Sequence, residues 1–216
     1  MAMKLRLGAS LGAAAPLNGM CTRCGKPCDE RGLHALVCKS TGGKRNSRHK
    51  AVKYSLMRVV RQVPSVSVLN EPPVDQYYKW RAAVPRDQRT NRRADVAVID
   101  QDQAEGPTSL IDIVVEHRGQ EACAEEGATA TVAASGEAKK ISLYTKLFTM
   151  NNADIIPFAM ESNGALGPLG MGFLKRMVDA AQAREKRVNL QWMLEDLSAS
   201  FQRSNADVLL AYHRTS

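Results

Sequence analysis

The sequence predicts an α/β (α+β) protein in which helices flank a mixed central sheet and a small zinc-binding module precedes it. Three observations lead to this prediction. Helix-like and strand-like apolar patterns follow one another after residue 48 in the order helix, three strands, helix, strand, helix. Four of the five cysteines lie within residues 21–38. With 216 residues, of which 44% are hydrophobic, the chain can bury one core of ordinary size.

Helices are predicted where apolar residues recur every three or four positions. The first should end at Pro64 and should follow a Gly- and Lys-rich turn at residues 39–47. Its apolar positions are Val52, Leu56, Val59 and Val60. A second is expected over residues 137–148, with its inward face formed by Ile141, Tyr144, Leu147 and Phe148. The C-terminal third should be helical too, with an apolar stripe formed by Leu190, Met193, Leu194, Leu197 and Phe201.

Strands are predicted where short apolar runs are bounded by turn residues. These runs are residues 66–69, 94–99, 110–116 and 155–160. A polar turn containing Gly106 and Pro107 should join the middle two. A low-complexity loop that contains Cys123 and a glycine-rich loop are expected at residues 119–137 and 163–172. The chain would then divide into a loosely structured segment, a zinc module, a main domain and a helical extension, at residues 1–20, 21–47, 48–175 and 176–216.

The cysteine cluster has the spacing of a zinc site: Cys21-x2-Cys24 is followed by His34-x3-Cys38. Two thiolates on a tight turn and a Cys/His pair about ten residues later can close a tetrahedron around zinc. Cys28 is a competing fourth ligand, and His49 is a more distant one. The alternative is a small core of reduced cysteines. An odd cysteine count and the absence of a secretory signal argue against a disulfide framework and for a reducing compartment.

Charge is concentrated in the first part of the chain. Residues 1–62 carry thirteen Lys and Arg against two acids, or +11, whereas the whole chain carries +8. Such a segment suits nucleic acid, because each neutralised phosphate releases a counterion; a merely solvated surface is the alternative. The candidate contacts are Arg48, His49, Lys50, Lys53, Arg92 and Arg93. No apolar run reaches the roughly 18–20 residues of a membrane span, so no membrane partner is expected.

Two aspartates are candidates for a second metal site. Asp112 interrupts the apolar run of residues 110–115, a pattern typical of a central strand buried on both faces. A carboxylate there needs a partner, a cation or a cleft, because desolvation is costly. Asp95 opens the neighbouring strand, and two such carboxylates suit Mg²⁺ or Mn²⁺. Alternatively, each aspartate binds a backbone amide or an arginine.

Lys140 lies four residues before Tyr144 and therefore on the inward face of its predicted helix. A lysine on such a face usually extends to water. Beside a two-carboxylate site it could instead orient the attacking water or stabilise negative charge in the transition state.

Several short motifs occur in one order along the chain. They are Cys-x2-Cys, His-x3-Cys, Arg48-His49, Glu71-Pro72, Arg93-Ala94-Asp95, Asp112, Lys140-x3-Tyr144 and Ile156-Pro157-Phe158. As an ordered set they resemble the C-terminal region of early-branching, site-specific non-LTR retrotransposon reverse transcriptases. That region is a CCHC zinc knuckle followed by a restriction-like endonuclease domain of the PD-(D/E)XK type. The resemblance covers residues 21–175, and no single motif in it is specific.

The resemblance implies a nuclear, Mg²⁺- or Mn²⁺-dependent endonuclease that nicks target DNA to prime reverse transcription. It assigns Asp95 and Asp112 as the metal-binding acids and Lys140 as the catalytic lysine, with Tyr144 in support. It also implies DNA and the element's RNA as partners, and a reverse-transcriptase domain in the parent polyprotein. No Tyr-x-Asp-Asp turn of a reverse transcriptase occurs in this chain. We therefore expect a fragment, a domesticated remnant or an accessory chain.

The sequence departs from the family pattern in three places. Ala94 replaces the proline before the first acid, and Val114 stands where simpler nucleases of the superfamily carry a strand lysine. Residues 119–137 lengthen the interval before Lys140. Two other hypotheses therefore stay open. One is a catalytically inactive module that binds nucleic acid through the zinc module and the basic helix, and the other is a protein-interaction domain that uses the C-terminal helices.

Overall fold

The computed structural model describes residues 19–28, 33–102, 109–117, 131–150 and 155–213. Most of the predicted N-terminal segment lies outside these residues. So do the turn with Gly106 and Pro107 and the part of the low-complexity loop that contains Cys123. Among the described residues, no helix is long and apolar enough to span a membrane.

Four strands form one mixed sheet in the order β1-β2-β3-β4. Their bounds are Val66–Asn70 for β1, Val96–Asp100 for β2, Ser109–Glu116 for β3 and Ile155–Glu161 for β4. β1 pairs antiparallel with β2, and β2 with β3, whereas β3 and β4 are parallel. A parallel pair requires a crossover connection, which here contains a helix. All four predicted strands are confirmed, and the fold is the predicted mixed α/β sheet flanked by helices.

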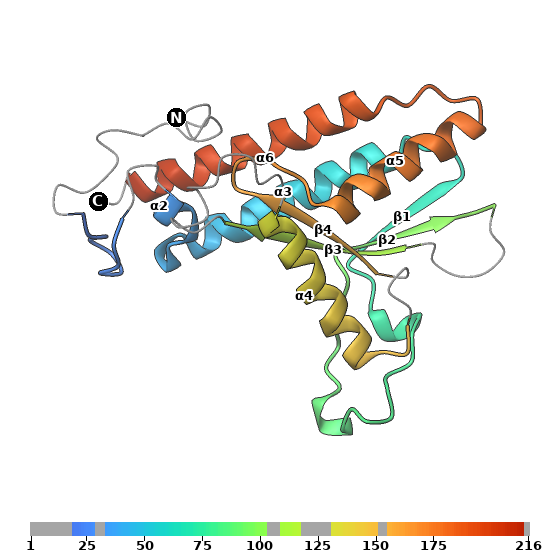
Figure 1. Ribbon diagram of the computed structural model, residues 1–216, viewed down its shortest axis with the longest axis horizontal. Coiled ribbons are helices and arrows are strands. Elements are labelled where there is room, and N and C mark those ends of the chain that lie inside the picture. Colours follow the sequence, from blue (N-terminus) through green and yellow to red (C-terminus); the bar gives the residue numbers. More distant parts are fainter. Residues whose placement is uncertain (1–18, 29–32, 103–108, 118–130, 151–154, 214–216) are drawn as a thin grey trace.

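Helices cover both faces of this sheet (Figure 1). Their bounds are Leu33–Val37 for α2, Gly42–Val60 for α3, Thr131–Leu147 for α4, Pro168–Ala183 for α5 and Leu190–His213 for α6. Short 3₁₀ turns occupy Lys39–Thr41, Val74–Gln76 and Arg86–Gln88. α3, α5 and α6 share one hydrophobic core with the sheet. α4 packs with the segment around Val74 and Ala94 in a second core, on the opposite face.

The alternation of side chains along β3 determines which residues meet α4. Ile111 and Ile113 belong to the core shared with α3, α5 and α6, whereas Leu110 belongs to the core beneath α4. Successive residues of a strand point to opposite faces. Asp112 therefore shares the face of Leu110 and points toward α4.

Three predicted element boundaries were wrong. α3 begins at Gly42, inside the turn predicted at residues 39–47, and α4 begins at Thr131, inside the loop predicted at 119–137. α5 begins at Pro168, inside the glycine-rich loop predicted at 163–172. The start of α5 has a tertiary cause. The carboxylate of Glu137 accepts hydrogen bonds from the amides of Leu169 and Gly170, both at 3.1 Å, and so satisfies free amides of the first turn.

The C-terminal helix is part of the main packing. α6 lies along α3 (Figure 1), and its Met193, Leu197 and Phe201 are buried in the shared core, as the apolar stripe predicted. α3 crosses the predicted boundary between residues 47 and 48, and α5 crosses the one between 175 and 176. The segment with the clustered cysteines and the sheet are therefore joined through continuous helices.

Candidate metal centre and carboxylate site

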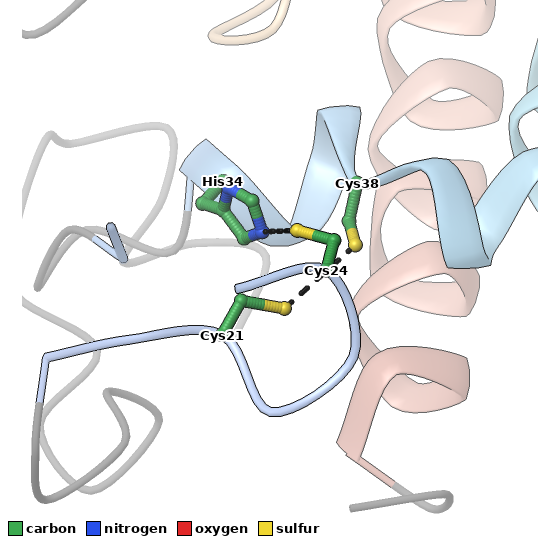
Figure 2. A group of neighbouring side chains, drawn as sticks. All are labelled: Cys21, Cys24, His34 and Cys38. Carbon is green, nitrogen blue, oxygen red and sulfur yellow. Dashed lines mark hydrogen bonds between the residues drawn. The ribbon is translucent and has the colours of Figure 1, made fainter. Parts of the chain in front are cut away.

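Cys21 and Cys24 lie in a tight turn near the start of the described chain. The Gly25 amide donates to the Cys21 carbonyl at 2.9 Å, and the Cys21 amide donates to the Lys26 carbonyl at 2.8 Å. Gly25 has a φ of +68°, which a residue with a Cβ adopts only at a cost. This turn directs both thiols toward His34 and Cys38 (Figure 2).

His34 and Cys38 are one helical turn apart. α2 carries His34, and the Cys38 amide donates to the His34 carbonyl at 2.8 Å. This i, i+4 relation places the two side chains on the same face of the helical turn. Cys21 and Cys38 are buried, whereas Cys24 and His34 are partly exposed.

The four ligand atoms lie close enough together to surround one metal ion. All lie within 4.8 Å of one another. The Cys21 and Cys38 sulfurs are 3.8 Å apart, and the Cys24 sulfur is 3.3 Å from Nε2 of His34. Tetrahedral zinc, with bonds of about 2.3 Å to sulfur and about 2.0 Å to nitrogen, separates two sulfurs by about 3.8 Å and a sulfur from a nitrogen by about 3.5 Å. The cluster could therefore hold a metal such as zinc with little movement.

The other two candidate ligands lie elsewhere. Cys28 is outside this group, and its thiol is 3.4 Å from the Tyr212 hydroxyl. His49 lies beside Asp95 in the carboxylate site. Burial opposes ionisation of Cys21, but hydrogen bonds from Tyr212 and from backbone amides outweigh it and lower the pKa of Cys21 to about 5. That favours the thiolate, which is the form that binds metal.

Asp95 lies immediately before β2, and its carboxylate accepts a hydrogen bond from a backbone amide of β3. β2 begins at Val96, so the β3 amide of Ile113 has no partner from the β2 backbone. It donates instead to Oδ2 of Asp95 at 2.7 Å. Nε2 of His49 is 3.2 Å from the same oxygen and 3.2 Å from the Ile113 carbonyl. Burial raises the pKa of Asp95, but the hydrogen bond and the charge of His49, together with the Ile113 amide, outweigh it and hold the pKa below its ordinary value. The same bond raises the pKa of His49.

Asp112 meets two side chains of α4. It is 7% exposed, and Nζ of Lys140 donates to its Oδ2 at 2.9 Å. The Tyr144 hydroxyl also bonds to it. Burial, followed by the charge and the hydrogen bond of Asp112, raises the pKa of Tyr144. Burial also raises the pKa of Asp112, with the nearby charge of Asp95 adding to the rise, although Lys140 opposes it. The structure thus brings together Asp95, Asp112, Lys140 and Tyr144.

A third ion pair lies near these aspartates and was not predicted from the sequence. The ammonium of Lys53 donates to Oε1 of Glu71; the Lys53 side chain is 1% exposed and that of Glu71 is 49% exposed. This hydrogen bond lowers the pKa of Glu71, which also experiences the charge of Asp95. Lys53 lies three and four residues before the buried Leu56 and Met57. Helical periodicity could therefore have shown that it faces inward.

The predicted nucleic-acid contacts divide into buried and accessible residues. Arg48 is 3% exposed and donates to Oδ1 of Asn205, the Leu36 carbonyl and Nε2 of His117. Arg48 and Lys53 thus lie on the packed face of α3 and are not surface residues, because each continues its apolar stripe. Lys50 is exposed.

The two arginines before β2, Arg92 and Arg93, also differ in exposure. Arg93 is exposed, and it donates to the Glu71 carbonyl at 2.6 Å. Arg92 is partly buried, with its guanidinium carbon 6.0 Å from the centroid of the Tyr144 ring. Arg93 is therefore the one of the two that a phosphate could reach freely.

The two clusters differ in the number of potential ligands. Among the described residues, the Cys/His cluster is the one group of three or more metal-binding side chains whose ligand atoms all lie this close together. Asp95 and Asp112 form a pair, which leaves further positions around a cation to water or substrate oxygens. No family model matches this chain, and no curated protein does either.

Proposed function

We propose that this chain is a Mg²⁺- or Mn²⁺-dependent DNA endonuclease domain of the restriction-like type, with zinc in the Cys/His cluster as a structural metal. One observation carries the proposal. Asp112 of β3, Asp95 just before β2, and a lysine and a tyrosine from one face of α4 lie together at one partly buried position. Asp112 sits at the centre of this group, with Lys140 at 2.9 Å.

Asp95 and Asp112 would hold the divalent cation. A bound cation would polarise the scissile phosphate and lower the pKa of the attacking water. Lys140 has a side chain that is 31% exposed, so its ammonium can reach both Asp112 and a phosphate oxygen at the surface. The Tyr144 hydroxyl would hold the Asp112 carboxylate in orientation. His49 would do the same for Asp95 through Oδ2.

The zinc cluster would have a structural role. Four protein ligands fill a tetrahedron and leave no position for a substrate. Lys50 and Arg93 are exposed and lie close to Glu71, whose amide donates to the Asp95 carbonyl: the charge of Lys50 acts on Glu71, and Arg93 donates to the Glu71 carbonyl. Positive side chains beside the carboxylates would attract a phosphodiester backbone to the site.

A catalytically inactive nucleic-acid-binding module is the second candidate. The observation that favours it is that both acids have cationic partners within the chain: His49 for Asp95 and Lys140 for Asp112. Such pairs neutralise buried carboxylates without any metal. The two candidates share fold and partner, so only metal-dependent cleavage distinguishes them.

The test is Mg²⁺-dependent nicking of supercoiled DNA by the wild type and by Asp112→Asn. A bound metal contributes several kcal/mol to the transition state, so the variant should nick slower by about a thousandfold. Its affinity for DNA should change little, because the lost interaction acts on the transition state. Asp102→Asn is the matched control, since the Asp102 side chain is 58% exposed at the end of β2. A wild type that nicks no duplex with any divalent metal would favour the binding module.

A further inference from the structure

The last turn of α6 covers the Cys/His cluster, although it is about 175 residues away in the sequence. Val208, Leu209 and Tyr212 pack with Leu36, Ala35 and the ligands Cys21 and Cys38 in one small buried core. Figure 2 shows α6 passing directly beside Cys38. The metal-binding turn is thus built against a helix from the other end of the described chain.

Tyr212 connects this helix to a ligand atom. Its hydroxyl donates to the Cys21 sulfur at 3.1 Å and lies 3.4 Å from the Cys28 sulfur. The Tyr212 and His34 rings meet edge to face, with centroids 6.2 Å apart. One side chain of α6 therefore touches two of the four ligands.

Arg23, which lies between Cys21 and Cys24 in the metal-binding turn, contacts the end of α6 from the opposite direction. Its guanidinium donates to the Ala211 carbonyl at 3.1 Å and to the Tyr212 carbonyl at 2.6 Å. Its central carbon lies 5.1 Å from the centroid of the Tyr212 ring. The last carbonyls of a helix lack partners within the helix, so Arg23 satisfies groups that the end of α6 leaves open.

We propose that the last turn of α6 is an outer part of the metal site, and that metal binding and docking of this turn are coupled. Tyr212 is a positioning residue that fixes the Cys21 sulfur through its hydroxyl, and Arg23 ties the turn between the first two ligands to the end of α6. The inference rests on the metal-binding half of the proposed function and is independent of nuclease activity. Hydrogen bonds to ligand atoms orient them and change metal affinity on the order of 10–100-fold.

A second contact supports the coupling between this cluster and α6. The buried guanidinium of Arg48 bonds to the Leu36 carbonyl of α2, which lies between His34 and Cys38, and to Asn205 of α6 at 3.0 Å. Two separate arginines therefore bridge the ligand-bearing segments to α6. Coupling of this kind makes each event favour the other by the same factor.

The experiment measures zinc affinity by chelator competition for wild type, Tyr212→Phe and Tyr54→Phe. Tyr212→Phe keeps the ring and removes only the hydroxyl, so zinc affinity should fall on the order of tenfold or more. Tyr54 is 53% exposed on α3, and its variant should bind zinc as the wild type does. Equal affinities for Tyr212→Phe and wild type would overturn the positioning role. A wild type that binds no zinc would overturn the zinc assignment itself.

Hydrogen exchange tests the coupling without a substitution. When a chelator removes zinc from the wild type, the amides of residues 208–212 should exchange faster on the order of tenfold or more. Amides of α5, on the main core, should change little. Unchanged exchange at the end of α6 would contradict the coupling even if Tyr212→Phe weakens zinc binding.

Discussion

The Cys/His cluster and the carboxylate pair differ in how their charges are balanced. In the first, three thiols and an imidazole point at one another. Thiols are weak hydrogen-bond donors and acceptors, so a contact such as the one between the Cys21 and Cys38 sulfurs at 3.8 Å stabilises the cluster little. In the second, Lys140 and His49 already neutralise the two acids. The first arrangement could therefore hold a cation such as zinc, whereas the two acids of the second already have partners of their own.

This difference explains why geometry supports the two metals unequally. Thiol groups gain little from facing other thiol groups in a small core, and these three thiols and the imidazole lie close enough together to hold a metal such as zinc. The contacts with His49 and Lys140 oppose the desolvation cost of the two carboxylates, although burial still raises the pKa of Asp112. Direct measurement of divalent-cation binding, together with metal-dependent cleavage, tests whether a cation also binds between them. Each prediction below tests one side of this comparison.

The largest effect is expected from Cys38→Ser. Loss of one ligand should abolish stoichiometric zinc binding and lower the free energy of unfolding by several kcal/mol, because metal binding energy is folding energy for so small a module. Metal analysis and thermal unfolding measure both. Cys28→Ser is the matched control, since Cys28 lies outside the group of ligands and should retain one zinc. If Cys28→Ser loses the metal and Cys38→Ser keeps it, the ligand set is wrong.

An intermediate effect is expected from Lys140→Met in the carboxylate site. The substitution leaves Asp112 buried without its ammonium partner and should lower the free energy of unfolding by about 1–3 kcal/mol. Adding Asp112→Asn should recover most of that loss, as urea unfolding of both variants would show. Lys139→Met, at an exposed neighbour on α4, is the control. Zinc content should be the same in all these variants. A stable Lys140→Met protein would argue against the ion pair as a structural element.

The smallest expected effect is a pH dependence of the free energy of unfolding. It arises from His117, at the junction of the Cys/His cluster and the carboxylate pair. Burial, with the charges of Arg48 and Arg45 in second place, lowers the pKa of His117 to about 3. Above pH of about 6.5 the imidazole is neutral in both the folded and the unfolded chain. As pH falls below that value only the unfolded chain takes up the proton, so stability is lost. The loss should reach about 2 kcal/mol at pH of about 5.

His117→Gln removes this titration and provides the comparison. When pH is lowered from about 8 to about 5, the free energy of unfolding of this variant should fall less than that of the wild type. The difference between the two decreases should equal the contribution of His117. Urea unfolding at each pH gives the two curves. If the free energies of unfolding of the two proteins change with pH in parallel, His117 takes up its proton in the folded protein without disturbing Arg48.

Much of the candidate site could be predicted from the sequence because its signals are local. The Cys-x2-Cys spacing requires only a tight turn, and the His-x3-Cys spacing requires only one turn of a helix. Both follow from the ordinary backbone geometry of turns and helices. Asp112 stood out because a single charge in a continuous apolar strand needs an explanation. Lys140 and Tyr144 were placed on one face by the period of the helix. Each of these inferences rests on a short, continuous segment, the longest of which runs from Cys21 to Cys38.

The remaining features depend on residues that are distant in the sequence. Glu137 sets the start of α5 because its carboxylate reaches amides more than thirty residues away. Lys53 and Arg48 were assigned to the surface because charged side chains usually face water, but Glu71 and Asn205 supply the partners that allow burial. The sequence by itself determined the strands, the ligand spacings and the inward face of α4. Only the tertiary structure decided which charged side chains are paired and that the Tyr212 hydroxyl contacts Cys21, because these contacts join segments that meet after the sheet and α6 have packed.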